Sequence, residues 1–115
     1  MKYLLLCCIE EKRWEAIPES QRNGIMRKYG ELLQSLDKSG HHLASAQLQS
    51  SSTATTVRGK NGKPLITDGP FAETKEQFGG YHLIECKDQD EAISIAKRIP
   101  TLPYGGAVEV RALIT

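Results

Sequence analysis

The segment from Lys2 to Ile9 is apolar on both of its alternating faces, and this feature limits the folds open to the chain. Successive side chains of a strand point to opposite faces, so such a strand must be covered on both sides. Its apolar run, Leu4 to Ile9, is far shorter than the roughly 20 residues that span a bilayer. Charged residues also follow it too abruptly for a signal peptide. We therefore expect an interior strand in a cytoplasmic protein.

Two later segments have the 3.6-residue periodicity of amphipathic helices. The first lies between Pro18, which suits a first helical turn, and Gly40, which suits a C-terminal cap. Its apolar face consists of Ile25, Tyr29, Leu32, Leu33 and Leu36. The second begins at Asp88 as N-cap and ends at Pro100. Its apolar face consists of Ala92, Ile93, Ala96 and Ile99.

The remaining segments predict strands and one hairpin. Strands are expected at His42–Gln49, Thr53–Arg58, Pro64–Thr67, Tyr81–Cys86 and Ala107–Ile114. The sequence Gly59-Lys60-Asn61-Gly62 is a strong hairpin signal, so the second and third of these strands form a ribbon projecting from the main sheet. Without the ribbon, the order is strand, helix, strand, strand, helix, strand. This order is typical of the α+β class with a ferredoxin-like βαββαβ fold, in which both helices cover one face of an antiparallel sheet.

The length and net charge of the chain limit the number of domains and the kinds of partner that we expect. A chain of 115 residues has room for one two-layer core, so we expect a single domain over residues 1–115. A net charge of +1 is too small to attract nucleic acid or an anionic membrane. The uncovered sheet face needs a partner, and a homodimer joined through the two sheets is the simplest one. Cys7, Cys8 and Cys86 are expected to be packing residues rather than disulfide or metal partners.

The segment from Asp68 to Tyr81 concentrates ionisable side chains beside a strand. Asp68-Gly69-Pro70 reads as a turn, in which Asp68 either bonds its own backbone or faces a cleft. Residues 72–77 are rich in helix formers and suggest one helical turn carrying Lys75 and Glu76, unless they form an ordinary solvated charge run. Gly79-Gly80 would give a β-bulge or allow a ligand or second chain to approach.

Several further residues are candidates for chemistry. Tyr81 and His82 follow the charged turn and point to opposite faces, and His82 can transfer protons near neutral pH, although a packed histidine is the plainer interpretation. Glu109 and Arg111 share one face of the last strand and can pair or hold a polar ligand together. Trp14 can cover the core or line a pocket.

His41 and His42 follow a helix end, where the helix dipole favours a cation and explains them without catalysis. Neither has metal-ligand spacing to a carboxylate or cysteine, so no metal is expected, and no cofactor is expected either.

Four segments together resemble the YCII-related family, specifically its DGPF branch. They are Thr53–Arg58, Thr67–Gln77, Gly79–Tyr81 and Val108–Arg111. The resemblance covers nearly the whole chain and implies a dimeric α+β barrel of ferredoxin-like subunits. It also implies a regulatory context, because genes of this branch often lie beside extracytoplasmic-function sigma factors. Asp68, Lys75, Glu76 and Arg111 match the branch, whereas His82 stands where an aromatic residue is more usual.

Three functions remain open from the sequence. The first is a binder of a small polar or aromatic ligand that serves a regulatory pathway. Its polar contacts would be Asp68, Lys75, Glu76, Glu109 and Arg111, with Phe71, Tyr81 and apolar sheet residues as walls. The second is a cofactor-independent hydrolase or isomerase with Asp68 or Glu76 as general base, assisted by His82. The third is an interaction module that contacts a sigma factor through the ribbon.

Overall fold

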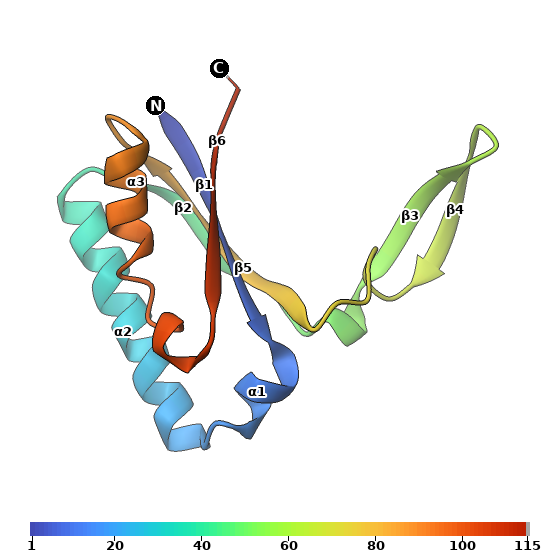
Figure 1. Ribbon diagram of the computed structural model, residues 1–115, viewed down its shortest axis with the longest axis horizontal. Helices are drawn as coiled ribbons and strands as arrows, with labels where there is room; N and C mark the ends of the chain where they lie inside the picture. The colour runs from blue at the N-terminus through green and yellow to red at the C-terminus, as the bar shows by residue number, and fades with distance from the viewer. Residues whose placement is uncertain (115) are drawn as a thin grey trace.

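The computed structural model describes residues 1–114, whose strands form a main sheet and a separate hairpin (Figure 1). The main sheet has the strand order β2-β5-β1-β6, and every neighbouring pair in it is antiparallel. Its strands are β1 (Lys2–Glu10), β2 (His42–Gln47), β5 (Glu76–Glu85) and β6 (Ala107–Ala112). The hairpin consists of β3 (Thr55–Lys60) and β4 (Lys63–Asp68).

Helices connect the strands and lie on one side of the main sheet (Figure 1). They are α1 (Glu11–Ala16), α2 (Glu19–Lys38) and α3 (Gln89–Ala96), with short 3₁₀ helices η1 (Ser51–Thr53) and η2 (Leu102–Tyr104). The α+β class and the ferredoxin-like order with an extra hairpin are thus confirmed. Asp88 caps α3 as expected, since its Oδ1 accepts a hydrogen bond from the Glu91 amide at 2.9 Å. No helix within residues 1–114 is long and apolar enough to cross a membrane.

The core lies between the helices and one face of the sheet. β1 buries alternate side chains from Tyr3 to Ile9 on this face, as its position between β5 and β6 requires. The most deeply buried large side chains are Leu5, Leu36, Ile84 and Ile99, which come from β1, α2, β5 and the turn after α3. These contacts fix α2 and α3 against the sheet.

The other face of the sheet, here called the open face, carries no helix (Figure 1). Leu4, Leu6, Tyr81 and Leu83 lie on it as cross-strand neighbours and are only partly buried. Glu109 and Arg111 of β6 lie beside Leu6 and Leu4 on the same face. The face is therefore apolar at its centre and charged toward β6.

The hairpin, here called the arm (residues 55–68), projects away from the main sheet (Figure 1). Asn61 and Gly62 at its tip both have positive φ, 53° and 76°, as a type I′ turn requires. Every residue of β4 is exposed, and Val57 and Ile66 face each other across the hairpin at 63% and 69% exposure. The predicted ribbon is thus present and makes an apolar projection.

Three local predictions were wrong. Residues 72–77 do not form a helical turn, because Glu76 and Gln77 already pair with β1 and start β5. β5 is consequently five residues longer at its beginning than expected. The second helix ends at Ala96, and its expected last turn is a hydrogen-bonded turn outside the helix that still buries Ile99. The charged residues after β1, for which the sequence predicts no element, form the short helix α1.

Candidate functional site

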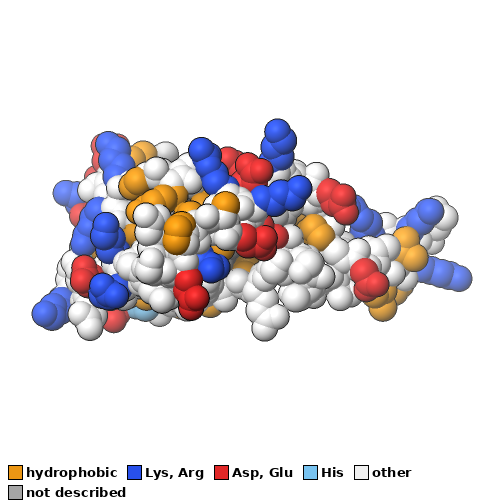
Figure 2. All heavy atoms as spheres, turned by 90° about the horizontal axis from the view of Figure 1, so that it is seen from below, with side chains coloured by type: hydrophobic (Ala, Val, Ile, Leu, Met, Phe, Trp, Pro, Cys, Tyr) orange, Lys and Arg blue, Asp and Glu red, His pale blue; other side chains and the backbone are white. Residues whose placement is uncertain are grey.

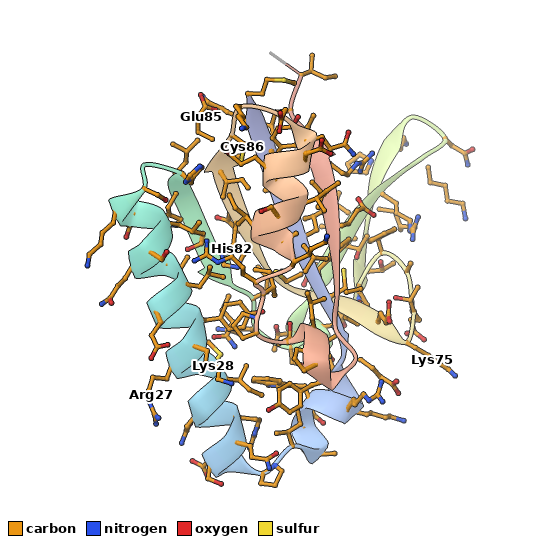
Figure 3. All side chains as sticks on the ribbon, turned by 60° about the vertical axis from the view of Figure 1, so that its left-hand side comes forward. Arg27, Lys28, Lys75, His82, Glu85 and Cys86 are labelled. Atoms are coloured by element: carbon orange, nitrogen blue, oxygen red, sulfur yellow. The ribbon has the colours of Figure 1, made fainter. Side chains whose placement is uncertain are left out.

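A cleft of about 800 Å³ lies between α2 and the helix-covered face of the sheet. From α2 the lining residues are Arg22, Met26, Tyr29 and Leu33. From the sheet they include Cys7, Ser45, Gly80 and His82. Trp14 and Thr101 complete the walls, so the alternative that Trp14 lines a pocket holds. Figure 3 shows the His82 side chain lying between the sheet and α2.

The helical wall follows directly from sequence spacing. Arg22, Met26, Tyr29 and Leu33 stand at intervals of four, three and four residues and therefore share one face of α2. This stripe runs from the polar Arg22 to the apolar Leu33. Figure 2, which views the molecule from below, shows hydrophobic side chains gathered among charged ones at the end where α1, the start of α2 and η2 meet.

Glycine allows β2 and β5 to approach closely at the floor of the cleft. A Cβ on Gly80 would lie 2.8 Å from the carbonyl oxygen of Ala46, closer than real Cβ atoms come. Gly79 is the extra residue of a β-bulge, because Cys7 pairs with Gly80 and Cys8 with Phe78. The predicted β-bulge is therefore present, and the close approach at Gly80 is made by β2 of the same chain. Approach of a ligand or a second chain at the glycine pair stays a prediction.

A buried chain of polar groups forms one end of the cleft. The Tyr29 hydroxyl and the Thr101 Oγ1 share a hydrogen bond of 3.0 Å. Burial raises the pKa of Tyr29 to about 12 and the pKa of the Cys7 thiol to about 11. Both groups therefore stay neutral at physiological pH. Cys7 is a packing residue with little thiolate character, in line with the prediction for it.

His82 stacks on Tyr29, with ring centroids 5.9 Å apart and ring planes 16° from parallel. Its side chain is buried, and burial lowers its pKa, with a smaller contribution from the positive charge that His42 would carry when protonated. The imidazole is therefore neutral at pH 7 and presents one N–H donor and one acceptor nitrogen. The stack offers a flat aromatic surface beside the cleft.

Two buried nitrogens of the cleft walls have no hydrogen-bond partner among residues 1–114. They are the Nε of Arg22 and the Nδ1 of His82. A buried polar atom without a partner costs roughly 1–3 kcal/mol, and few native groups bear this cost unless a water, ion or ligand satisfies them. Both nitrogens belong to residues that line the same cleft. Two residues that line the cleft, on α2 and on β5, thus carry unmet hydrogen-bonding capacity.

The rim is held in place by Glu11 of α1. Its Oε1 accepts a hydrogen bond of 2.7 Å from the Ser51 amide, and its Oε2 accepts one of 2.8 Å from the Ser51 hydroxyl. These bonds tie α1 to η1 across the mouth of the cleft. No group of three His, Cys, Asp or Glu side chains in the described part of the chain is arranged to hold a metal.

Of the site residues predicted from the sequence, only His82 lines this cleft. Asp68 ends β4 at the base of the arm and is exposed. The next residue, Gly69, has a φ of 96°, and its amide donates to the Ala54 carbonyl at 2.7 Å. The bond from Gly69 therefore fastens the base of the arm. The interpretation that Asp68 bonds its own backbone stays a prediction. The roles of Asp68 as general base or ligand contact stay predictions.

The other residues of the charged segment are spread along the chain's surface. Lys75 is exposed in the loop before β5, and its side chain points outward in Figure 3. Glu76 is exposed at the first position of β5, opposite Glu10 of β1. Phe71 is 65% exposed, and its carbonyl accepts a hydrogen bond from Arg58 of the arm.

The remaining candidates lie on the open face. Glu109 and Arg111 are 3.5 Å apart and form an exposed ion pair, which matches the plainer interpretation of their spacing. Tyr81 lies beside Leu6 on this face, opposite in direction to His82 as predicted. A role for these three residues in ligand binding stays a prediction, and it would require a site on the open face.

Sequence reasoning missed most of the cleft. Arg22 and Tyr29 lie seven residues apart on one helix face, and a charged residue on a core-facing stripe is a signal that could have revealed them. Ser45 and Thr101 gave no comparable signal, because a single hydroxyl in a strand or loop has many uses. Their positions depend on how the sheet and η2 pack.

Comparisons with known proteins agree with this fold. The chain is 34% identical over 114 residues to an uncharacterized protein of Rhizobium meliloti (strain 1021), covering 98% of this chain and 92% of that protein. Its fold matches 5-chloro-2-hydroxyhydroquinone dehydrochlorinase from Burkholderia phenoliruptrix AC1100, solved in complex with 2,5-dihydroxybenzoquinone. That match has a TM-score of 0.55 and 14% identity, and it covers 99% of this chain and 94% of the other. The model of the YCII-related domain matches residues 1–115, and the chain belongs to that family.

Proposed function

We propose that this protein binds a small planar molecule with oxygen substituents in the cleft between α2 and the sheet. The observation that carries the proposal is the pair of buried, unpartnered nitrogens, Arg22 Nε and His82 Nδ1, on the walls of one cleft. A cleft of about 800 Å³ lies within the 300–1,000 Å³ range typical of small-molecule sites. A ligand would restore hydrogen bonds that the protein itself does not supply.

The chemistry of the walls indicates the ligand class. Arg22 carries a permanent positive charge and only donors, so it requires a carboxylate, phenolate or carbonyl oxygen. The stacked Tyr29 and His82 rings, with Met26 and Leu33, favour a flat apolar ring. The dehydrochlorinase of similar fold was solved with 2,5-dihydroxybenzoquinone, a ring of this kind, which supports its choice as a probe.

A thermal-unfolding screen tests the proposal. The probes are 2,5-dihydroxybenzoquinone, hydroquinone, benzoate and 4-hydroxybenzoate. A ligand at 100 times its Kd stabilises the folded state by about 2.7 kcal/mol, which raises the melting temperature by about 10 °C in a chain of this length. Loss of a charged hydrogen bond costs about 1.5–3 kcal/mol, so Arg22→Gln should weaken binding roughly 10- to 150-fold.

Arg27→Gln is the matched control, because Arg27 lies on the same helix but is exposed and points outward (Figure 3). It should bind the probes as the wild type does. If no probe raises the melting temperature, or if Arg22→Gln and Arg27→Gln behave alike, the assignment of the cleft is wrong.

We further infer that two copies of the chain associate through their open faces. The centre of the open face, around Leu6, Tyr81 and Leu83, is apolar and half-buried, and no helix covers it. An apolar sheet face of this kind needs a partner, and the ferredoxin-like fold, with helices on one face of the sheet, leaves it uncovered. Sedimentation of the wild type should give a dimer, and Leu6→Glu should give a folded monomer. A wild-type monomer at 100 µM would exclude the pairing.

A second candidate function is protein recognition through the arm. The exposed pair Val57 and Ile66 favours it, because a two-stranded hairpin without cover is marginally stable alone. The sigma-factor link stays a prediction from the family resemblance. Titration of a purified extracytoplasmic-function sigma factor from the same organism tests it, with Val57→Ser expected to weaken binding. Equal binding by the wild type and Val57→Ser would reject the arm as the contact.

A further inference from the structure

A hydrogen-bonded chain of three side chains leads from the end of α2 to the cleft. The Oδ1 of Asp37 lies 2.6 Å from the Nδ1 of His42, and the Nε2 of His42 lies 3.1 Å from the Oγ of Ser45. Ser45 lines the cleft, while the side chain of His42 is 18% exposed and that of Asp37 is 63% exposed. The order is acid, imidazole, hydroxyl, with a different ring nitrogen bonded to each neighbour.

This arrangement depends on an irregularity in β2. Residues three apart on a regular strand point to opposite faces, which would separate His42 from Ser45. His42 pairs with Ile84 of β5, and Ser45 pairs with His82. The two β2 residues are three positions apart, whereas their β5 partners are two positions apart, so β2 contains one extra residue. The extra residue places both side chains on the helix-covered face, and the last turn of α2 brings Asp37 to His42.

We propose that Asp37, His42 and Ser45 form an acyl-transfer triad that gives the cleft esterase activity toward small aromatic esters. The proposal rests on the proposed cleft, which supplies the site for the substrate. With its Nδ1–H donating to Asp37, the His42 ring accepts the Ser45 proton at Nε2, which is the division of roles found in Ser-His-Asp enzymes on unrelated folds.

The chemical step balances without a cofactor. Ser45 Oγ attacks the ester carbonyl and its proton passes to His42 Nε2. The tetrahedral intermediate then expels the alcohol, which takes the proton from His42 and leaves an acyl-Ser45 ester. Water, deprotonated by His42, hydrolyses that ester to a carboxylic acid and regenerates Ser45. Asp37 is a positioning residue, since it touches only His42.

His82 supplies the group that stabilises the developing oxyanion. It pairs directly with Ser45 across β2 and β5 on the same sheet face, where opposed Cβ atoms lie about 4.5–5.5 Å apart. Its ring is neutral, and its Nδ1 has no partner in the described chain. An imidazole N–H held in a buried site is a suitable oxyanion donor.

A second hydrogen-bonded set of acid, imidazole and hydroxyl provides a comparison within the same chain. The Nδ1 of His41 lies 2.6 Å from the Oγ of Ser39, and its Nε2 lies 2.9 Å from the Oε1 of Glu91. This second chain has the same three kinds of group, but Ser39 is exposed and does not line the cleft. Hydrogen bonding alone therefore does not distinguish Ser39 from Ser45, whereas access to the cleft does.

Labelling with a fluorophosphonate probe, quantified by intact mass and peptide mapping, tests the triad. We expect one adduct on Ser45 of the wild type, loss of at least 20-fold in Ser45→Ala, and wild-type labelling in Ser39→Ala. Asp37→Asn should lower the maximal labelling rate about 10-fold without changing the half-saturating probe concentration. If Asp37 had a purely structural role, its substitution would not lower the maximal labelling rate while leaving the half-saturating probe concentration unchanged. Mapping the wild-type adduct does not depend on how any variant folds.

An unlabelled wild type, or an adduct on Ser39, would overturn the triad. Hydrolysis of 4-nitrophenyl acetate gives a second measurement, and an equal rate for the wild type and Ser45→Ala would also overturn it. The thermal-unfolding screen separates the two proposals. Probe binding with an unlabelled Ser45 rejects the triad alone, whereas the absence of both binding and labelling rejects the cleft as well.

Discussion

Substitution of Gly80 by alanine tests how tightly β2 is held against β5 beside the cleft. The added Cβ would lie 2.8 Å from the Ala46 carbonyl oxygen and 3.5 Å from the Gln47 Cα. These atoms belong to backbone, so a whole strand must shift to relieve the contact. Overpacking of this kind costs about 1–3 kcal/mol.

Gly79→Ala is the matched control, because the nearest atom to its added Cβ, the Cys7 carbonyl oxygen, is at an ordinary 3.9 Å. Both substitutions restrict the unfolded chain similarly, a contribution of about 0.4–1 kcal/mol in favour of folding. The difference between the two variants cancels this contribution. We therefore expect Gly80→Ala to be about 1–3 kcal/mol less stable than Gly79→Ala.

Urea unfolding followed by Trp14 fluorescence measures this difference. The shift of β2 should also move Ser45, so probe affinity in the cleft should fall in Gly80→Ala and persist in Gly79→Ala. Equal stability of the two variants within 0.5 kcal/mol, a margin taken from the usual scatter of neutral substitutions, would refute the close approach of the strands.

The remaining predictions concern the cleft and the core. Tyr29→Phe should cost about 1–3 kcal/mol in urea unfolding, because it leaves the buried Thr101 hydroxyl without its partner; a cost below 0.3 kcal/mol would contradict this. Burial lowers the pKa of His82 below its ordinary 6.5. The unfolded chain then binds the proton more readily, so this contribution to stability is complete above pH 6.5 and is lost as the pH falls toward the folded pKa. His82→Phe should lose less stability than the wild type between pH 7.5 and 5, and parallel profiles would exclude the assignment. Leu36→Ala should cost about 2–5 kcal/mol, as expected for a side chain with 1% exposure, measured by the urea midpoint.

The fold could be predicted largely from local patterns. The apolar residues on both faces of β1 predict a central strand. The apolar residues at 3.6-residue spacing in α2 predict a helix and the side of it that faces the core. The Asn61-Gly62 turn likewise fixes the arm. Local patterns could not show where hydrogen-bonded pairing between strands outweighs the helix propensity of a segment. Residues 72–77 favour helix locally, yet pairing of Glu76 with Glu10 extends β5 instead.

The cleft was harder to predict, because it is assembled from distant segments. His82 was identified as a proton-transfer candidate, but its neighbours Tyr29 and Ser45 come from α2 and β2. The hydrogen bond between His42 and Ser45 depends on a β-bulge that no residue pattern in β2 signals. The helix-dipole interpretation of His42 was compatible with its place after α2 but did not reveal this bond.

The central claim is that the cleft binds a small molecule through Arg22 and His82. Its most direct test is an NMR titration that follows the ¹⁵N resonances of the His82 ring with benzoate, hydroquinone and 4-hydroxybenzoate. We predict that at least one compound shifts these resonances saturably and that Arg22→Gln raises the required concentration at least 10-fold. Unchanged His82 resonances with every compound at millimolar concentration would contradict the account.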